Sequence, residues 1–222
     1  MNKISAMVLC GIVISAIIFP VLEVKGEDMK MIKLPEPKME GRVSVEEAIA
    51  KRRSVRSYSS RELSAEDLSQ LLWACQGITD QKRGLRAAPS AGALYPLEIY
   101  IVKKDGVFYY HCATHALERL SESDMRNDLA QAAYGQRFVA EAAVDIVIAA
   151  VYERVTSKYG ERGMRYTNME AGHAAENIFL QAVALGIDSV AVGAFNDAAV
   201  SKVVNLPAGA KPLYILPVGH KK

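Results

Sequence analysis

The stretch from Tyr166 to Leu185 constrains this fold more than any other, because it predicts one long helix that is small or apolar on most faces. Its small and apolar residues include Ala171, Gly172, Ala174, Ala175, Ile178, Leu180, Ala182 and Val183. A helix that is apolar all round is buried all round, so we expect it at the centre of the molecule. Small side chains also allow close helix contact, so we expect this helix to pack against the same helix of a second subunit. Gly186 is expected to end the helix.

The segments on either side of this helix predict a mixture of helices and strands. Ser44 and Ser64 read as N-caps of two helices, which end near Arg52 and at Gly77. Strands are expected at 97–103, 107–112, 145–151, 189–195 and 212–218, and further helices at 115–120, 124–133, 138–143 and 197–204. Polar residues 156–165 lack a core-facing pattern. Strands and helices do not alternate regularly, so this order predicts an α+β domain.

Length and composition describe one domain and exclude some functions. The chain has 222 residues, of which 50% are hydrophobic, enough for a sizeable core but not for a second full domain. Its formal net charge of +2 is too small for nucleic-acid binding by bulk electrostatics. No pair among the 4 histidines has metal-ligand spacing, so no metal is expected. Residues 27–42 predict an extended arm, and 43–222 the domain.

Residues 1–26 differ from the rest of the chain. An apolar run from Ala6 to Leu22 follows Lys3, and polar residues follow the run. This order predicts an export signal with a cleavage site at 24–26. An uncleaved membrane anchor is the alternative, because the run is near the lower length limit for crossing a bilayer. We therefore expect an exported protein, periplasmic or extracellular, or one that contacts the membrane through this segment only.

Basic residues gather between positions 51 and 56, at the expected end of the first helix. Cations there complement the negative end of the helix dipole, which is the structural interpretation. The alternation of Arg52, Ser54 and Arg56 favours a functional one, because an extended exit from the helix sends these side chains the same way. Planar guanidinium groups suit phosphate oxygens. The segment is therefore a candidate phosphate site.

A loop of small residues and prolines runs from Gly84 to Pro96. Its length and apolar character are unlike those of a surface turn. Small side chains give a flat ligand close access to the backbone, so we expect this loop to bind one. A plain turn before the next strand is the alternative.

Four stretches together resemble the FMN-dependent nitroreductase-like superfamily, and within it the SagB-type dehydrogenase group. They are 52–58, 88–97, 170–177 and 192–195. The resemblance covers residues 43–219 and implies a nitroreductase-like α+β fold, with a central, mainly antiparallel sheet flanked by helices. It also implies an intertwined homodimer with one FMN in each of two pockets at the subunit interface.

The same resemblance assigns roles to residues. The phosphate and ribityl chain of FMN would be held by Arg52, Arg53, Ser54 and Arg56. The flavin ring would lie along Pro89, Ser90, Ala91, Gly92 and Leu94, with Gly193 and Ala194 on its other side. A backbone N–H near Glu170 to Gly172 would face the reactive nitrogen of the flavin and tune it. Any late basic contact to the phosphate would come from residues 220–222.

These roles imply an FMN-dependent oxidoreductase that passes hydride through the flavin, as a dehydrogenase or an NAD(P)H-dependent reductase. Its substrate would be a small molecule or a peptide-like compound. Ala93 and Tyr95 stand where ordinary nitroreductases carry Asn and Gln, which argues against ordinary nitro reduction. The rival function is a flavin- or nucleotide-binding module without turnover, a sensor or carrier. A purely structural dimer is a third hypothesis.

Lys158 and Tyr159 are the candidate catalytic residues. Some SagB-type enzymes oxidise peptide azolines with a Lys–Tyr pair beside the flavin, and this pair is similar in position. Lys158 would act as a base, provided that burial or neighbouring cations lower its pKa. A solvated lysine on a mobile loop is the alternative.

Overall fold

The structure is a computed structural model and describes residues 31–222. Its centre is a seven-stranded sheet in the order β1-β6-β5-β4-β7-β9-β8, in which every neighbouring pair is antiparallel. Its strands are β1 Met31–Lys33, β4 Leu97–Lys103, β5 Gly106–His111, β6 Ala116–Ser121, β7 Val144–Val151, β8 Asp188–Ser189 and β9 Ala210–Gly219. A separate hairpin consists of β2 Ile78–Asp80 and β3 Leu85–Arg86. The predicted α+β class with a mainly antiparallel sheet is confirmed.

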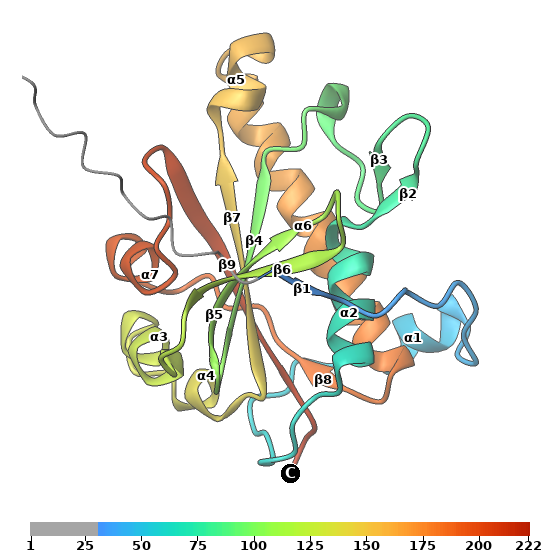
Figure 1. The fold of residues 1–222 in the computed structure, drawn as a ribbon, viewed down its shortest axis with the longest axis vertical. Helices are drawn as coiled ribbons and strands as arrows, with labels where there is room; N and C mark the ends of the chain where they lie inside the picture. The colour runs from blue at the N-terminus through green and yellow to red at the C-terminus, as the bar shows by residue number, and fades with distance from the viewer. Residues whose placement is uncertain (1–30) are drawn as a thin grey trace, which may run out of the picture.

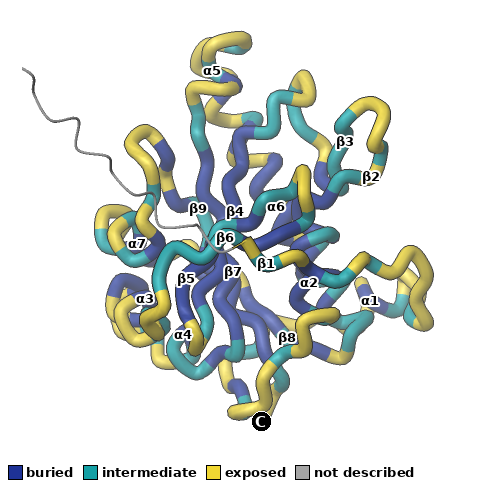
Figure 2. Tube along the Cα trace, in the orientation of Figure 1, coloured by how far each residue is buried: buried dark blue, intermediate teal, exposed yellow. Residues whose placement is uncertain are grey.

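Helices cover both faces of this sheet. They are α1 Val45–Lys51, α2 Ala65–Gln76, α3 Arg126–Ala132, α4 Arg137–Glu141, α5 Glu153–Tyr159, α6 Arg162–Ala184 and α7 Asp197–Val203, with a short 3-10 helix, η1, at Ala91–Ala93. Figure 1 shows α2 and α6 on one side of the sheet and α3, α4 and α7 on the other, with α5 at one end. The two layers of helix bury the central strands between them, which are dark blue in Figure 2.

The core follows from the alternation of side chains along the strands. In β7, Ile146 and Ile148 join the cluster under α2 and α6, while Val147 and Ala149 join the cluster under α3, α4 and α7. Successive side chains of a strand point to opposite faces, so a strand that is apolar at every position is buried on both. This explains why the continuous apolar run at 146–151 belongs to a central strand.

The two predicted N-caps are confirmed. The Ser44 hydroxyl accepts a hydrogen bond from the backbone N–H of Glu47 at 3.1 Å, and the Ser64 hydroxyl accepts one from Asp67 at 3.0 Å. Such caps satisfy N–H groups that have no partner within the helix. The chain leaves α1 at Arg52 in an extended conformation, as the basic alternation required.

Two sequence predictions of local structure are wrong, and two further segments have more regular structure than their sequences indicated. Residues 115–120 form the strand β6 instead of a helix, because they pair with β5 on one side and with β1 on the other. The expected strand at 189–195 is limited to β8, followed by an isolated bridge at Val192. Residues 156–165 belong to α5 and to the first turn of α6. The arm contributes β1 to the edge of the sheet.

The long helix α6 starts four residues earlier than predicted, at Arg162, and is buried on one face only within a single chain. Ala171, Ala174 and Ile178 lie in the core, whereas Met164 and Met169 are 52% and 47% exposed. Burial on every face would therefore require another molecule. The predicted packing against a second subunit stays a prediction.

The expectation of export or membrane anchoring is corrected. Within residues 31–222, no helix has the length and apolar character needed to cross a bilayer. Residues 1–26, on which that expectation depended, lie outside the described residues. We therefore withdraw it.

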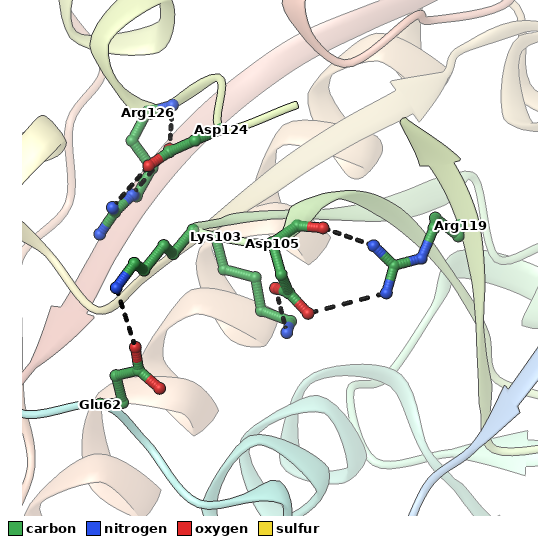
Figure 3. A network of polar contacts seen from close by, with 7 residues as sticks. Glu62, Lys103, Asp105, Arg119, Asp124 and Arg126 are labelled. Atoms are coloured by element: carbon green, nitrogen blue, oxygen red, sulfur yellow. Dashed lines mark hydrogen bonds and ion pairs between the residues drawn. The ribbon is translucent and has the colours of Figure 1, made fainter. Parts of the chain in front are cut away.

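A group of charges surrounds the turn between β4 and β5. Asp105 lies between Lys103 and Arg119, and Arg126 pairs with Asp124 at 2.7 Å (Figure 3). Partly exposed pairs like these contribute little stability individually. They mark the end of the sheet at which β4 finishes, opposite to the small-residue loop that leads into β4.

Candidate active site

The basic segment lies against the edge of the sheet where β9 ends. Ser54 forms a parallel bridge with Ser189 of β8, and the backbone N–H of Val55 donates to the Ser189 carbonyl at 3.1 Å. The chain then runs beside the C-terminus, where the N–H of Ser59 donates to the carbonyl of His220 at 2.8 Å. This pairing fixes the direction in which the basic side chains leave the backbone.

The three arginines of this segment differ in what they bind. The guanidinium groups of Arg52 and Arg56 make no hydrogen bond or ion pair within the part of the chain that the structure describes, although that of Arg56 lies 6.0 Å from the centre of the Phe138 ring. Arg53 donates to the carbonyls of Ala50 and Arg52, at 3.0 and 2.7 Å, and so closes the end of α1. Two guanidinium groups therefore keep free donors for an anion, while Arg53 already has acceptors.

The C-terminal residues lie along the same segment. Lys221 forms an antiparallel bridge with Tyr58, and the Lys222 ammonium pairs with Glu141 at 3.0 Å. Residues 220–222, from which a late basic contact to the phosphate is expected, thus lie beside the basic segment. The Lys222 ammonium already pairs with Glu141.

Gly193 and Ala194 continue the same edge. Val192 bridges Ile215 of β9, and the two residues after Val192 are exposed. Their backbone N–H groups donate to no acceptor in residues 31–222, while the Ala194 carbonyl accepts from the Gln136 amide at 3.0 Å. We call Arg52, Ser54, Arg56, Gly193 and Ala194 the basic edge.

The expected backbone donor near Glu170 to Gly172 is not available in this fold. These residues lie in the middle of α6, where backbone N–H groups bond to the carbonyls four residues earlier. In contrast, the free N–H groups of Gly193 and Ala194 could face a ligand. The helical pattern of the sequence was the signal that could have excluded the first assignment.

The small-residue loop has an unusual backbone. Gly92, Ala93 and Tyr95 have positive φ angles of 64°, 54° and 45°. For residues other than glycine this conformation costs about 1–2 kcal/mol each, and such strain is often found at functional sites. One contact within the loop and one from outside it hold it in place: the Tyr95 N–H donates to the Ser90 hydroxyl at 2.9 Å, and Arg154 donates to the Tyr95 carbonyl at 3.1 Å.

The predicted catalytic pair lies directly on this loop. A Cβ atom added to Gly92 would lie 2.8 Å from the Tyr159 hydroxyl and 3.1 Å from the Lys158 ammonium nitrogen. Lys158 makes no ion pair within residues 31–222. We call residues 89–96, together with Lys158 and Tyr159, the loop end.

Glu170 lies beneath the loop end and is 2% exposed. Burial raises the pKa of its carboxyl to about 7, against the smaller opposing effects of the Ser90 hydroxyl and the Arg86 guanidinium. Neither of its oxygens makes a hydrogen bond of normal geometry among the described residues. Its carboxyl group, rather than its backbone, is therefore what this position brings to the site.

Arg52, Ser54 and Arg56 of the basic edge lie far from the loop end in one chain, whereas Gly193 and Ala194 follow Val192, which is level with the middle of β4. The loop leads into Leu97 at the start of β4, where the Pro96 carbonyl accepts from the Val151 N–H. The basic segment lies beside Ser189, which pairs with Val218 of β9. Across the sheet, Val218 pairs with Val144 of β7, and Val144 pairs with Lys103 at the other end of β4. The length of β4 alone separates the loop from the basic segment by about 20 Å, at about 3.4 Å per residue. Figure 1 shows the loop near α5 and the segment beside β8 at opposite ends of the sheet.

Sequence reasoning missed two arginines that support the loop. The Arg86 guanidinium lies 4.4 Å from the centre of the Tyr95 ring, and the backbone N–H of Arg86 donates to the Tyr95 hydroxyl at 3.0 Å. Arg154 forms an ion pair with Glu98, and the Tyr109 hydroxyl donates a hydrogen bond to the same carboxylate. These contacts join four elements, so a local pattern could not reveal them.

Known proteins resemble this chain closely. The sequence model of the Nitroreductase family matches residues 49–220. MJ1384 of Methanocaldococcus jannaschii, which is named for the nitroreductases, is 42% identical over 202 residues, or 88% of this chain and 98% of that protein. The NADPH-flavin oxidoreductase of Vibrio harveyi is 27% identical over 47% of each chain. A crystal structure assigned to the nitroreductases, from Ralstonia eutropha JMP134, has a TM-score of 0.79 and 27% identity, over 86% of this chain and 90% of that chain.

Proposed function

The chain belongs to the nitroreductase family of oxidoreductases, and from this premise we propose that two copies of it bind FMN between them. Similarity to a flavin oxidoreductase supports a flavin. The SagB-type assignment remains part of the proposal. It rests on the small-residue loop at 88–97 and on the position of Lys158.

The chemistry of the basic edge fits the phosphate end of FMN. Arg52 and Arg56 carry guanidinium groups with free donors, and Ser54 adds a hydroxyl between them. Charge-assisted hydrogen bonds from such groups are the strong ones in phosphate binding. The free N–H groups of Gly193 and Ala194 suit the polar edge of the flavin ring. We propose these five residues as the FMN contacts of one chain.

The chemistry of the loop end fits the flat ring. Ser90, Ala91 and Gly92 present little side chain, so a planar group can approach the backbone, and Pro89 and Leu94 add apolar surface on either side of them. Because Arg52, Ser54 and Arg56 lie at the opposite end of β4 from the loop end, one FMN would meet both only if they came from two chains. This separation is the observation that carries the proposal.

Exposed apolar residues offer a surface for the second copy. Val45 and Ile49 of α1 are 64% and 59% exposed, and Met164 and Met169 lie on the exposed face of α6. Exposed apolar patches of this kind mark contact sites. An interface built on α1 and α6 would bury the small-residue helix more completely, in line with its composition.

FMN would supply the hydride acceptor and donor of the reaction. The chain would bind and orient the flavin and exclude water from it, and Lys158, whose Nζ atom lies beside Gly92, would accept a proton from a substrate over the loop. The position of Lys158 and Tyr159 on Gly92 favours dehydrogenation of a peptide-like substrate. Reduction of a small molecule by NAD(P)H is the second candidate, favoured by the Vibrio harveyi relative.

An absorption spectrum of purified protein reconstituted with FMN tests this proposal. We expect a bound flavin spectrum with one FMN per chain, bleached by dithionite and restored by an electron acceptor. A protein that stays colourless after incubation with FMN would refute flavin binding. A coloured protein without turnover on any donor and acceptor would instead support a binding module.

A further inference from the structure

A small cavity lies behind the loop end. It has a volume of about 190 Å³ and is lined by residues from α2, β3, β4, β5 and α5, among them Gln76, Arg86, Glu98, Tyr109 and Arg154. Sites for drug-sized ligands typically measure about 300–1,000 Å³, so this cavity is too small for a flavin. It has room for a few waters or one small ion.

An unsatisfied donor lines this cavity. The Gln76 side chain is 0% exposed, and its Nε2 group has no hydrogen-bond partner among the described residues. Its Oε1 atom accepts from the Arg86 guanidinium at 3.0 Å, which fixes the amide orientation. A buried donor without a partner is destabilising, so the free amide calls for an acceptor that residues 31–222 do not provide.

The charges around the cavity leave one cation without a counterion. Arg154 pairs with Glu98, which also accepts from the Tyr109 hydroxyl. Arg86 forms no ion pair within residues 31–222 and lowers the pKa of Glu170 only through its field. The cavity therefore has a surplus of positive charge and of hydrogen-bond donors.

We propose that this cavity binds a small oxyanion, a carboxylate first of all, between the Gln76 amide and the Arg86 guanidinium. A guanidinium group matches the planar, two-oxygen geometry of a carboxylate. The occupant would satisfy the free amide and neutralise Arg86 together. Flavin is not needed for this binding, because the basic edge and the ring-facing residues of the loop do not line the cavity.

Occupancy of the cavity would also reach the loop. The Arg86 guanidinium lies over the ring of Tyr95, and the Arg154 guanidinium donates a hydrogen bond to the backbone carbonyl of Tyr95. Tyr95 has a strained backbone that these contacts maintain. A bound anion would hold both arginines and so stabilise the conformation of residues 89–96.

Thermal unfolding in exchanged salts tests this site. The full-length protein with FMN added is heated at constant ionic strength while sodium acetate replaces sodium chloride, and a second series uses sodium phosphate. Above the dissociation constant, the unfolding midpoint should rise by about 3–6 °C for each tenfold increase in acetate. If the midpoint rose with phosphate but not with acetate, the site would stand, and its ligand would be a tetrahedral oxyanion instead of a carboxylate.

Two variants separate this site from general salt effects. Gln76→Glu places a carboxylate beside Arg86 and should abolish the acetate-dependent rise, because the chain then supplies its own anion. Arg83→Gln removes an exposed arginine from the same hairpin, paired with Asp80 outside the cavity, and should keep the rise. An equal rise in parent and Gln76→Glu, or no rise in the parent with either anion, would overturn the proposal.

Discussion

The ammonium nitrogen of Lys158 lies 3.1 Å from the point that a Cβ atom on Gly92 would occupy. A glycine is therefore needed at position 92 for two reasons: its φ is positive, and the side chains of Lys158 and Tyr159 occupy the space that a Cβ atom would need. The loop end depends on this contact, because it brings a predicted base onto a surface that suits a planar ligand.

Gly92→Ala should strain the backbone and also displace the side chains that lie against Gly92. The control is Gly84→Ala, because Gly84 has a φ of 66° and no atom within 4 Å of an added Cβ. Both variants should lose about 1–2 kcal/mol of unfolding free energy from the left-handed backbone. Only Gly92→Ala should also displace Tyr159 and lower turnover. Equal stability and equal turnover in the two variants, measured by urea unfolding and steady-state kinetics, would contradict the contact.

Lys158→Met should lower turnover by about 100-fold to 10,000-fold, the usual contribution of a positioned acid or base. FMN affinity should stay at the parental value, since Lys158 is not among the proposed phosphate contacts. Lys104→Met removes an exposed lysine at the far end of β4 and serves as the control. Parental turnover in Lys158→Met would remove this residue from catalysis.

Arg52→Ala combined with Arg56→Ala should weaken FMN binding. Each charged hydrogen bond contributes about 1.5–3 kcal/mol, so the dissociation constant should rise by at least about 100-fold. Lys51→Ala removes a neighbouring cation that pairs with Glu47 and should leave affinity unchanged. Fluorescence titration of FMN measures all three proteins, and an unchanged affinity in the double variant would exclude these arginines.

Glu170→Gln should change how stability depends on pH. The carboxyl has a pKa of about 7 in the folded protein and 4.5 when unperturbed. Between these values the folded protein keeps the proton that the unfolded chain has lost, so stability falls as the pH rises and levels off above about 7. The loss is at most about 3 kcal/mol.

Gln at this position stays neutral, so urea unfolding of Glu170→Gln from pH 4.5 to 8 should show a smaller decline than the parent. Glu176→Gln, exposed on the same helix, should follow the parent. Parallel curves for parent and Glu170→Gln would show that the buried carboxyl does not titrate in this range.

Local sequence patterns predicted the parts of the fold that depend on neighbouring residues. The caps at Ser44 and Ser64 and the β4–β5 hairpin follow from short-range chemistry. The prediction of a helix at 115–120 was wrong because pairing with β5 stabilises this segment as a strand, whatever its local helical pattern.

The candidate site divides in the same way. The alternation at Arg52, Ser54 and Arg56 and the small-residue loop were visible locally, but their separation depends on the pairing of β4, β7 and β9. No local pattern encodes that register. The support of Tyr95 by Arg86 and Arg154 was invisible for the same reason.

The central claim is that each FMN lies between the basic edge of one chain and the loop end of another. Mixing two defective chains tests it directly: Arg52→Ala/Arg56→Ala, and Ala91→Trp, which fills the surface expected to take the ring. In a mixed dimer, one site receives both defects and the other receives none. Random mixing after unfolding and refolding should therefore restore about a quarter of the parental FMN binding. No restoration in a mixture proven to contain mixed dimers would show that both parts serve the same chain and would contradict this account.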